Sequence, residues 1–319
     1  PYVDHMQKGI NEFEGGDYFE AREQFFKALA TARKNKLSKN KVADALHHLI
    51  SASAESKEYD MANDYLTELA ELSGVKSYTK IPETAEAAET YFDKALLLML
   101  GSDSDLRKAA DIIQKARGYY EGHDGHAGDT MRCLATLGQI KILENNFSEA
   151  KKYMDQAVEI AKSDPTVSQL ELALRMDQLG DAYILLSQKT KGKNYFDEAA
   201  AEYSEALDLR QDTLNSKDHA ALAQSYLRLG VVNYLKDDYN KALENLNKSL
   251  EIRTKQGRPL AIAEVKRAIS YVYLAQKKPQ DASKAFEDAI ATAQKAGPEA
   301  EKHIAKWKTV FSKISGIHN

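Results

Sequence analysis

The stretch AQSYLRLGVVNYLKDDYNKALENLNKSL, residues 223–250, contains two helical patterns separated by a short polar turn at residues 236–238. In each half, apolar residues recur every three or four positions, which places them on one face of a helix. Gly230 lies on that face in the first half, and Ala242 follows it twelve positions later in the second half. Because small side chains let two helix backbones approach closely, the stretch predicts a pair of antiparallel helices.

The same spacing of small residues recurs along the chain. One small residue precedes an alanine by twelve positions, and another small residue follows that alanine by seven. The clearest sets are Gly9, Ala21 and Ala28; Gly138, Ala150 and Ala157; and Gly230, Ala242 and Ser249. Aligned on this frame, the chain divides into seven repeats, which start near residues 2, 43, 90, 131, 173, 223 and 263. Such a period is typical of stacked helix pairs, and it predicts an all-α fold.

The pattern within one repeat resembles the tetratricopeptide repeat. In the fifth repeat the matching residues are Leu179, Gly180, Tyr183, Phe196, Ala199, Tyr203, Ala206 and Leu207. The repeats start 40 to 50 residues apart. This exceeds the family's usual period of about 34 residues and is similar to the kinesin-light-chain form of the repeat. The resemblance implies a right-handed superhelical solenoid of about seven helix–turn–helix pairs. It would form a single array over residues 1–319, closed by a capping helix at residues 298–316.

Some parts of the chain depart from the regular frame. The second and third repeats carry Ile50 and Leu97 where glycine is expected. The helix crossing of the second repeat should therefore be looser or shifted. A linker at residues 73–84, which contains a glycine and a proline, separates these two repeats. A polar, basic insertion at residues 187–194 lengthens the fifth repeat.

Composition and charge exclude several classes of protein. The chain has 44 Lys and Arg against 48 Asp and Glu, a net charge of -4. Binding to nucleic acid normally requires a basic excess, so no nucleic-acid partner is expected. No apolar run approaches the roughly 18 residues of a transmembrane segment, so none is expected. The one cysteine, Cys133, cannot form an intrachain disulfide, which favours a cytoplasmic location. The chain begins with Pro1, and we expect it to be a piece of a longer protein.

The sequence lacks the motifs of common enzyme classes, including a nucleophile elbow, a phosphate-binding loop and an HExxH helix. The segment from His123 to Cys133 groups side chains that can bind metals, but its spacing matches no strong zinc pattern. A glycine-rich connection between repeats accounts for it. We therefore expect no metal, no cofactor and no catalytic residues. The alternative of an enzyme would require this cluster to bind a metal ion.

The resemblance also implies that the first helix of each pair lines a concave surface. The residues carried over to this surface are Asp44, His47, Ser51, Glu55, Lys94, Arg132, Gln139, Asp177, Asp181, Gln224, Glu264, Arg267 and Tyr271. Arg132 and Arg267 are expected to hold carboxylates. Asp177 and Asp181 are expected to hold basic groups, and Tyr271 to offer a flat apolar contact. Such a face suits an extended or helical peptide with charges of both signs.

The sequence thus predicts a non-enzymatic scaffold that binds a protein or peptide in the concave groove. One alternative is the peptide-sensing regulatory domain of a bacterial signalling protein, which long-period arrays also resemble. Another is a solvated groove without a specific ligand. An acidic chaperone tail is not expected, because the family's clamp for such tails needs lysine and asparagine where this chain has Met6 and Ile10.

Overall fold

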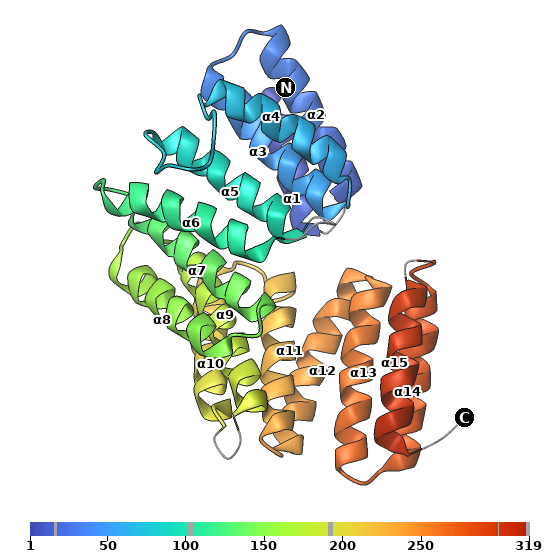
Figure 1. Ribbon diagram of the computed structural model, residues 1–319. Helices are drawn as coiled ribbons and strands as arrows, with labels where there is room; N and C mark the ends of the chain where they lie inside the picture. The colour runs from blue at the N-terminus through green and yellow to red at the C-terminus, as the bar shows by residue number, and fades with distance from the viewer. Residues whose placement is uncertain (16–17, 101–104, 191–193, 299, 317–319) are drawn as a thin grey trace. The chain divides into compact units, whose positions relative to one another are not determined.

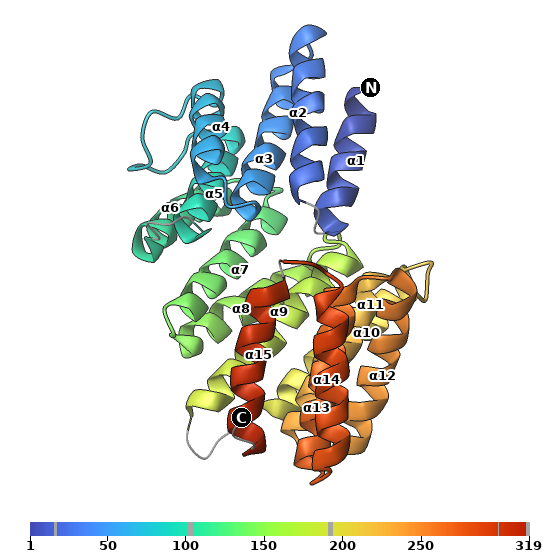
Figure 2. The same cartoon turned by 90° about the vertical axis from the view of Figure 1, so that its right-hand side faces the viewer.

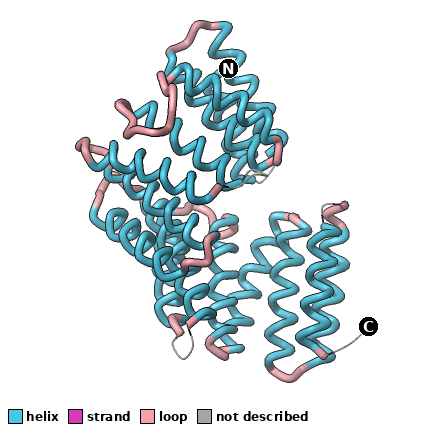
Figure 3. The backbone as a smooth tube through the Cα atoms, viewed as in Figure 1, coloured by secondary structure: helices cyan, strands magenta, loops and turns pink. Residues whose placement is uncertain are grey.

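The computed structural model describes residues 1–15, 18–100, 105–190, 194–298 and 300–316. Within these ranges the chain is all-α, with fifteen helices and no strand (Figure 3). The helices are α1 Tyr2–Gly15, α2 Tyr18–Lys34, α3 Lys39–Glu55, α4 Tyr59–Leu72, α5 Ala85–Leu100, α6 Leu106–Glu121, α7 Ala127–Leu143, α8 Phe147–Ser163, α9 Gln169–Lys189, α10 Phe196–Thr213, α11 Ala220–Leu235, α12 Tyr239–Gln256, α13 Pro259–Ala275, α14 Pro279–Gln294 and α15 Ala300–Ser315.

The chain forms two compact units, the N-terminal unit Pro1–Ile160 and the C-terminal unit Ala161–Asn319. Within each unit, consecutive helices pack against one another as pairs joined by short turns, as Figures 1 and 2 show for α11 with α12 and for α13 with α14. Pairs also pack on their neighbours along the chain, α2 on α3 and α6 on α7 in the first unit, and α10 on α11 and α12 on α13 in the second. This consecutive packing of helix pairs is that of a helical solenoid, as the repeated spacing predicts.

The glycines of the repeated frame lie where the two helices of a pair cross. A Cβ atom added to any of four of them would come within 2.8 Å of a side chain on the paired helix. These contacts join Gly9 to Phe25, Gly138 to Met154, Gly180 to Tyr203 and Gly230 to Leu246. Such distances are too short for real Cβ atoms, so only glycine permits this approach. The structure confirms the steric role predicted for these positions.

Short turns inside the pairs share a backbone signature. Asn145, Asp237 and Lys277 follow α7, α11 and α13 with φ of 59°, 61° and 59°. This left-handed conformation ends a helix. The next helix then starts at a cap, as where the Asp238 carboxylate accepts the backbone N–H of Lys241 at 3.2 Å. The polar turn at residues 236–238 therefore ends one helix and begins the next.

Each unit buries its own apolar core between the helices. In the N-terminal unit Phe25, Leu46 and Leu49 are completely buried, and in the C-terminal unit Tyr203 and Val232 are. Burial of one such side chain contributes roughly 1.5–3 kcal/mol, so packing between helices outweighs the helix propensity of any single segment.

The first helices of the pairs start close to the predicted repeat boundaries. They begin at Tyr2, Lys39, Ala85, Ala127, Gln169, Ala220 and Pro259, at most five residues before the frame positions. After the seventh pair, α15 covers the last apolar face. The ring of Phe311 stacks on that of Phe286 in α14 with centroids 4.0 Å apart, and Trp307 is buried beside it.

Candidate binding site

The predicted binding residues lie on the first helices of pairs in both units. In the N-terminal unit they are Asp44, His47, Ser51 and Glu55 on α3, Lys94 on α5, and Arg132 and Gln139 on α7. In the C-terminal unit they are Asp177 and Asp181 on α9, Gln224 on α11, and Glu264, Arg267 and Tyr271 on α13. The structure brings Asp44, His47 and Arg132 together around one cavity, which the other four residues of the first set do not line.

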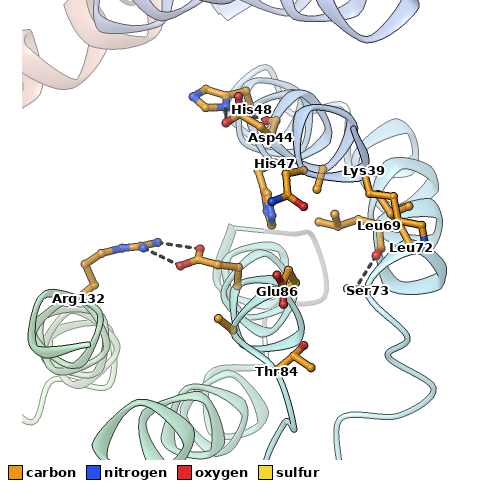
Figure 4. Close-up of a pocket in the computed structure, with 14 residues that line it drawn as sticks. Lys39, Asp44, His47, His48, Leu69, Leu72, Ser73, Thr84, Glu86 and Arg132 are labelled. Atoms are coloured by element: carbon orange, nitrogen blue, oxygen red, sulfur yellow. Dashed lines mark hydrogen bonds and ion pairs between the residues drawn. The ribbon is translucent and has the colours of Figure 1, made fainter. Parts of the chain in front are cut away.

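This cavity has a volume of about 690 Å³ and lies entirely within the N-terminal unit. Its walls come from α3, the end of α4, the start of α5, and Arg132 of α7 (Figure 4). Apolar lining is provided by Ala43, Leu69, Leu72 and Ala85. Charged and titratable lining is provided by Lys39, Asp44, His47, His48, Glu86, Glu89 and Arg132. A cavity of this size with an apolar part and a few polar groups is typical of a ligand site.

The long connection between α4 and α5 borders the cavity. It follows Leu72 and ends at Thr84, whose hydroxyl caps α5 by accepting the backbone N–H of Ala87 at 3.1 Å. The connection is fixed by Tyr91 of α5, whose hydroxyl lies 2.8 Å from the carbonyl oxygen of Lys80 and 3.1 Å from that of Ser77. The linker that the sequence predicts at residues 73–84 is thus held against α5, and its two ends, Ser73 and Thr84, line the cavity.

His47 connects the two main walls of the cavity. Its Nδ1 atom pairs with the carboxylate of Asp93 on α5, and Asp93 itself is only 7% exposed. Burial disfavours the charged form of His47. The hydrogen bond and the charge of Asp93 outweigh burial, with Glu89 and Asp44 adding to the effect, so the pKa of His47 lies above its ordinary value.

This pair makes the stability of the N-terminal unit depend on pH. Because the pKa of His47 is raised by folding, its contribution is complete below the unfolded pKa of about 6.5 and is lost as the pH rises through the folded value. We expect the difference in unfolding free energy between the wild type and His47→Gln to shrink with rising pH. Urea unfolding of both proteins at a series of pH values measures it, and a difference that stays constant would contradict the assignment.

Arg132 is already paired within the chain. Its guanidinium donates two hydrogen bonds to the carboxylate of Glu89, at 2.8 and 3.2 Å, and lies 3.3 Å from Asp129. It also stacks 4.6 Å from the ring centre of Phe92. A bidentate pair of this kind holds arginine in one orientation. The sequence singled out Arg132 but missed Glu89, because the two residues are 43 positions apart.

In the C-terminal unit, two arginines pair with the predicted acidic residues Asp177 and Asp181. Arg210 of α10 donates to Asp177 at 2.6 Å, and Arg228 of α11 contacts Asp177 at 3.2 Å and Asp181 at 3.3 Å. Asp177 is 1% exposed, whereas the side chain of Asp181 is 42% exposed. The structure therefore places these carboxylates in a network that joins three helices, with Asp181 at its open edge.

Arg210 has a counterpart one repeat later. Arg253 donates to Gln224 at 2.6 Å, to the carbonyl oxygen of Ala261 at 2.7 Å and to Glu264 at 3.1 Å. Both arginines are 6% exposed and stand eleven positions after the frame alanine of their repeat. This recurrence was the sequence signal by which both could have been found.

Arg267 and Tyr271 lie against the last helix. The guanidinium of Arg267 lies 5.0 Å from the ring centre of Trp307 and 5.4 Å from that of Tyr271. The ring of Tyr271 stacks with that of Phe311 at 6.3 Å. These two predicted residues thus contribute to the packing of α15.

The segment from His123 to Cys133 has structural contacts. His123 stacks on Tyr119 with centroids 4.2 Å apart, and His126 pairs with Asp129 at 2.8 Å. Cys133 is buried, and burial raises the pKa of its thiol to about 12. In the described part of the chain, no group of three or more His, Cys, Asp or Glu side chains is placed to hold a metal ion.

The stacked pairs and their glycine crossings define a helical-repeat protein. Residues 132–164 and 193–255 each match a family model of the tetratricopeptide repeat. These two segments are thus tetratricopeptide repeats, and they lie within the array of helix pairs. A search of curated protein sequences finds no match. None of the helices in the described ranges has the length and apolarity needed to span a bilayer.

Solved structures share this fold at low sequence identity. The apo form of RapI is 12% identical, with a TM-score of 0.66, covering 98% of this chain and 81% of that one. The apo form of the quorum sensor NprR from B. thuringiensis is 14% identical, with a TM-score of 0.62 and the same coverage. A putative kinesin light chain from Podosopora anserina is 15% identical, with a TM-score of 0.56, covering 68% of this chain and 99% of that one.

Proposed function

We propose that this chain is a non-enzymatic scaffold that binds a segment of a protein or peptide, and that the cavity between α3, α4 and α5 is its main contact site. The cavity itself carries this proposal. It has about 690 Å³ of space, apolar and charged walls, and three of the residues that the sequence places on a binding face. Its tetratricopeptide fold is in keeping with this role, because helix pairs present grooves to other chains.

Preorganisation supports recognition of a flexible ligand. The cavity walls are held by the pair of His47 with Asp93, by the pair of Arg132 with Glu89, and by the hydrogen bonds of Tyr91 to the α4–α5 connection. A receptor that is already ordered loses little conformational entropy when it binds, so more of the contact energy remains as affinity. The predicted residues outside the cavity remain candidates for contacts with a longer ligand.

A peptide-sensing regulatory domain is the second candidate. The similarity to NprR, described as a quorum sensor, favours it. In that case the bound segment would be a free signalling peptide, and binding would be coupled to an effector. Both candidates need the same contact site, so the site can be tested first.

A peptide library displayed on phage and selected on the immobilised full chain provides this test. Asn40 is exposed and lines the cavity, so Asn40→Trp should place a large side chain in the cavity without disturbing the core. We expect the peptides recovered by the wild type to be recovered at least tenfold less by Asn40→Trp. The matched control is Asn63→Trp, an exposed position on α4 that does not line the cavity, and its recovery should equal that of the wild type. Recovery unaffected by Asn40→Trp would refute the site.

A further inference from the structure

We propose that the cavity of the N-terminal unit recognises a peptide segment in which a lysine or arginine side chain stands next to an apolar side chain. The inference rests on the proposed function and adds the chemistry of the ligand. It reverses the charge preference expected of Arg132 from the sequence, and it follows from which charges in the cavity are already paired.

The fixed cation of the cavity, Arg132, is already compensated by carboxylates of the chain. Arg132 shares its two hydrogen bonds with Glu89 and has a second carboxylate, that of Asp129, at 3.3 Å. A ligand carboxylate that approached Arg132 would meet the negative charge of both of these carboxylates. Arg132 therefore acts as part of the wall and neutralises Glu89.

Two carboxylates, in contrast, are open to a ligand. Glu86 lies at the start of α5 and lines the cavity (Figure 4). It is exposed, and its carboxylate forms no hydrogen bond or ion pair with any described residue. The side chain of Asp44 on α3 is 52% exposed. Asp44 accepts a hydrogen bond from the hydroxyl of Tyr2 at 3.0 Å and lies 3.7 Å from His48. A cationic group between the two walls would be attracted by both carboxylates.

The remaining cations do not cancel this negative charge. His47 is already engaged by the buried carboxylate of Asp93. Lys39 stands at the start of α3, more than one helical turn before Asp44. The lining thus has three carboxylates against two permanently charged cations, one of which is paired with Glu89. The open part of the cavity is acidic.

The apolar lining sets the second half of the ligand's chemistry. Leu72 at the end of α4 and Ala43 on α3 are partly buried and border the same space as Asp44 and Glu86. An apolar side chain placed there would be removed from water while its charged neighbour reaches the carboxylates. In a ligand with one cationic and one apolar side chain, the first would pair with the carboxylates of the cavity while the second packs on its apolar lining.

Three small probes separate the contribution of charge from that of apolar contact. They are pentylguanidinium, pentanoate and pentanol, each titrated into the isotopically labelled full chain. Backbone amide shifts of Ala43 and Ala85 report occupancy of the cavity. We expect pentylguanidinium to bind at least tenfold more tightly than pentanoate. The double variant Asp44→Asn with Glu86→Gln should weaken pentylguanidinium about tenfold and leave pentanol unchanged.

A second double variant controls for net charge. Asp64→Asn with Glu71→Gln removes the same charge from exposed positions on α4 that do not line the cavity, and it should bind pentylguanidinium like the wild type. Pentanoate binding as tightly as pentylguanidinium, or no shift of these amides with any probe, would overturn the inference. If peptide recovery still depends on Asn40 in that case, the proposed function stands and only the ligand chemistry fails.

Discussion

Gly180→Leu is expected to lower the free energy of unfolding of the C-terminal unit by about 3 kcal/mol. A Cβ atom at this position would lie 2.5 Å from the ring of Tyr203, which is 1% exposed and cannot move aside without opening the pair of α9 and α10. Displacement of the ring would also break the hydrogen bond from its hydroxyl to Asp181 at 2.5 Å. Urea unfolding of the full chain, followed by far-UV circular dichroism, measures the loss.

Gly128→Leu is the control for this prediction. Gly128 also lies in a helix, α7, but an added Cβ would meet nothing within 4 Å. Replacing a helical glycine then gains up to about 1 kcal/mol of helix propensity, so stability should be unchanged or slightly raised. Equal losses at the two glycines would show that the substitution acts through something other than the close crossing.

Arg210→Met should destabilise the C-terminal unit by about 3 kcal/mol. The substitution leaves the carboxylate of Asp177, which is 1% exposed, without its 2.6 Å partner. It also removes a hydrogen bond of 2.6 Å from Arg210 to Ser225. Asp177 would keep only the longer contact with Arg228 at 3.2 Å. Because a poorly compensated buried charge accounts for most of the cost, the double variant Arg210→Met with Asp177→Leu should recover a large part of it. A double-mutant cycle from urea unfolding gives the coupling energy.

Arg33→Met provides the comparison at the surface. Arg33 pairs with Glu68, but the two side chains are 49% and 39% exposed. Water screens such a pair, so its loss should cost less than about 1 kcal/mol. If Arg210→Met cost no more than Arg33→Met, the buried network would not be a source of stability.

The sequence predicts the helix pairs well because their determinants are local. Gly180 and Gly230 are recognisable from their fixed distance to a later alanine, and a close crossing needs little more than small residues at both positions. The turn at residues 236–238 is equally local, since it depends on a left-handed residue and a cap. A short repeated pattern therefore contains most of the information for this fold.

The site is less predictable because its contacts join distant parts of the chain. The helical period predicts that Arg132 and Asp177 lie on solvent-facing sides of their helices. It does not reveal that Glu89 pairs with Arg132 across 43 positions. Nor does it reveal that Arg210 pairs with Asp177 across 33 positions. The cavity is likewise lined by α3, α4 and α5 and by both ends of the connection at residues 73–84, segments that lie apart in the sequence. Residue type and period identify candidates, whereas pairing decides which candidates remain open to a ligand.

The connection between α4 and α5 also suggests how such arrays acquire new specificities. Repeats with short connections stack directly, and their glycine crossings tolerate little change. A longer segment between two repeats spaces them apart and creates a hollow without altering either crossing. Insertion and deletion in this one segment can therefore add or remove a recognition pocket while the rest of the array keeps its sequence, which makes connection length a route to functional divergence among related chains.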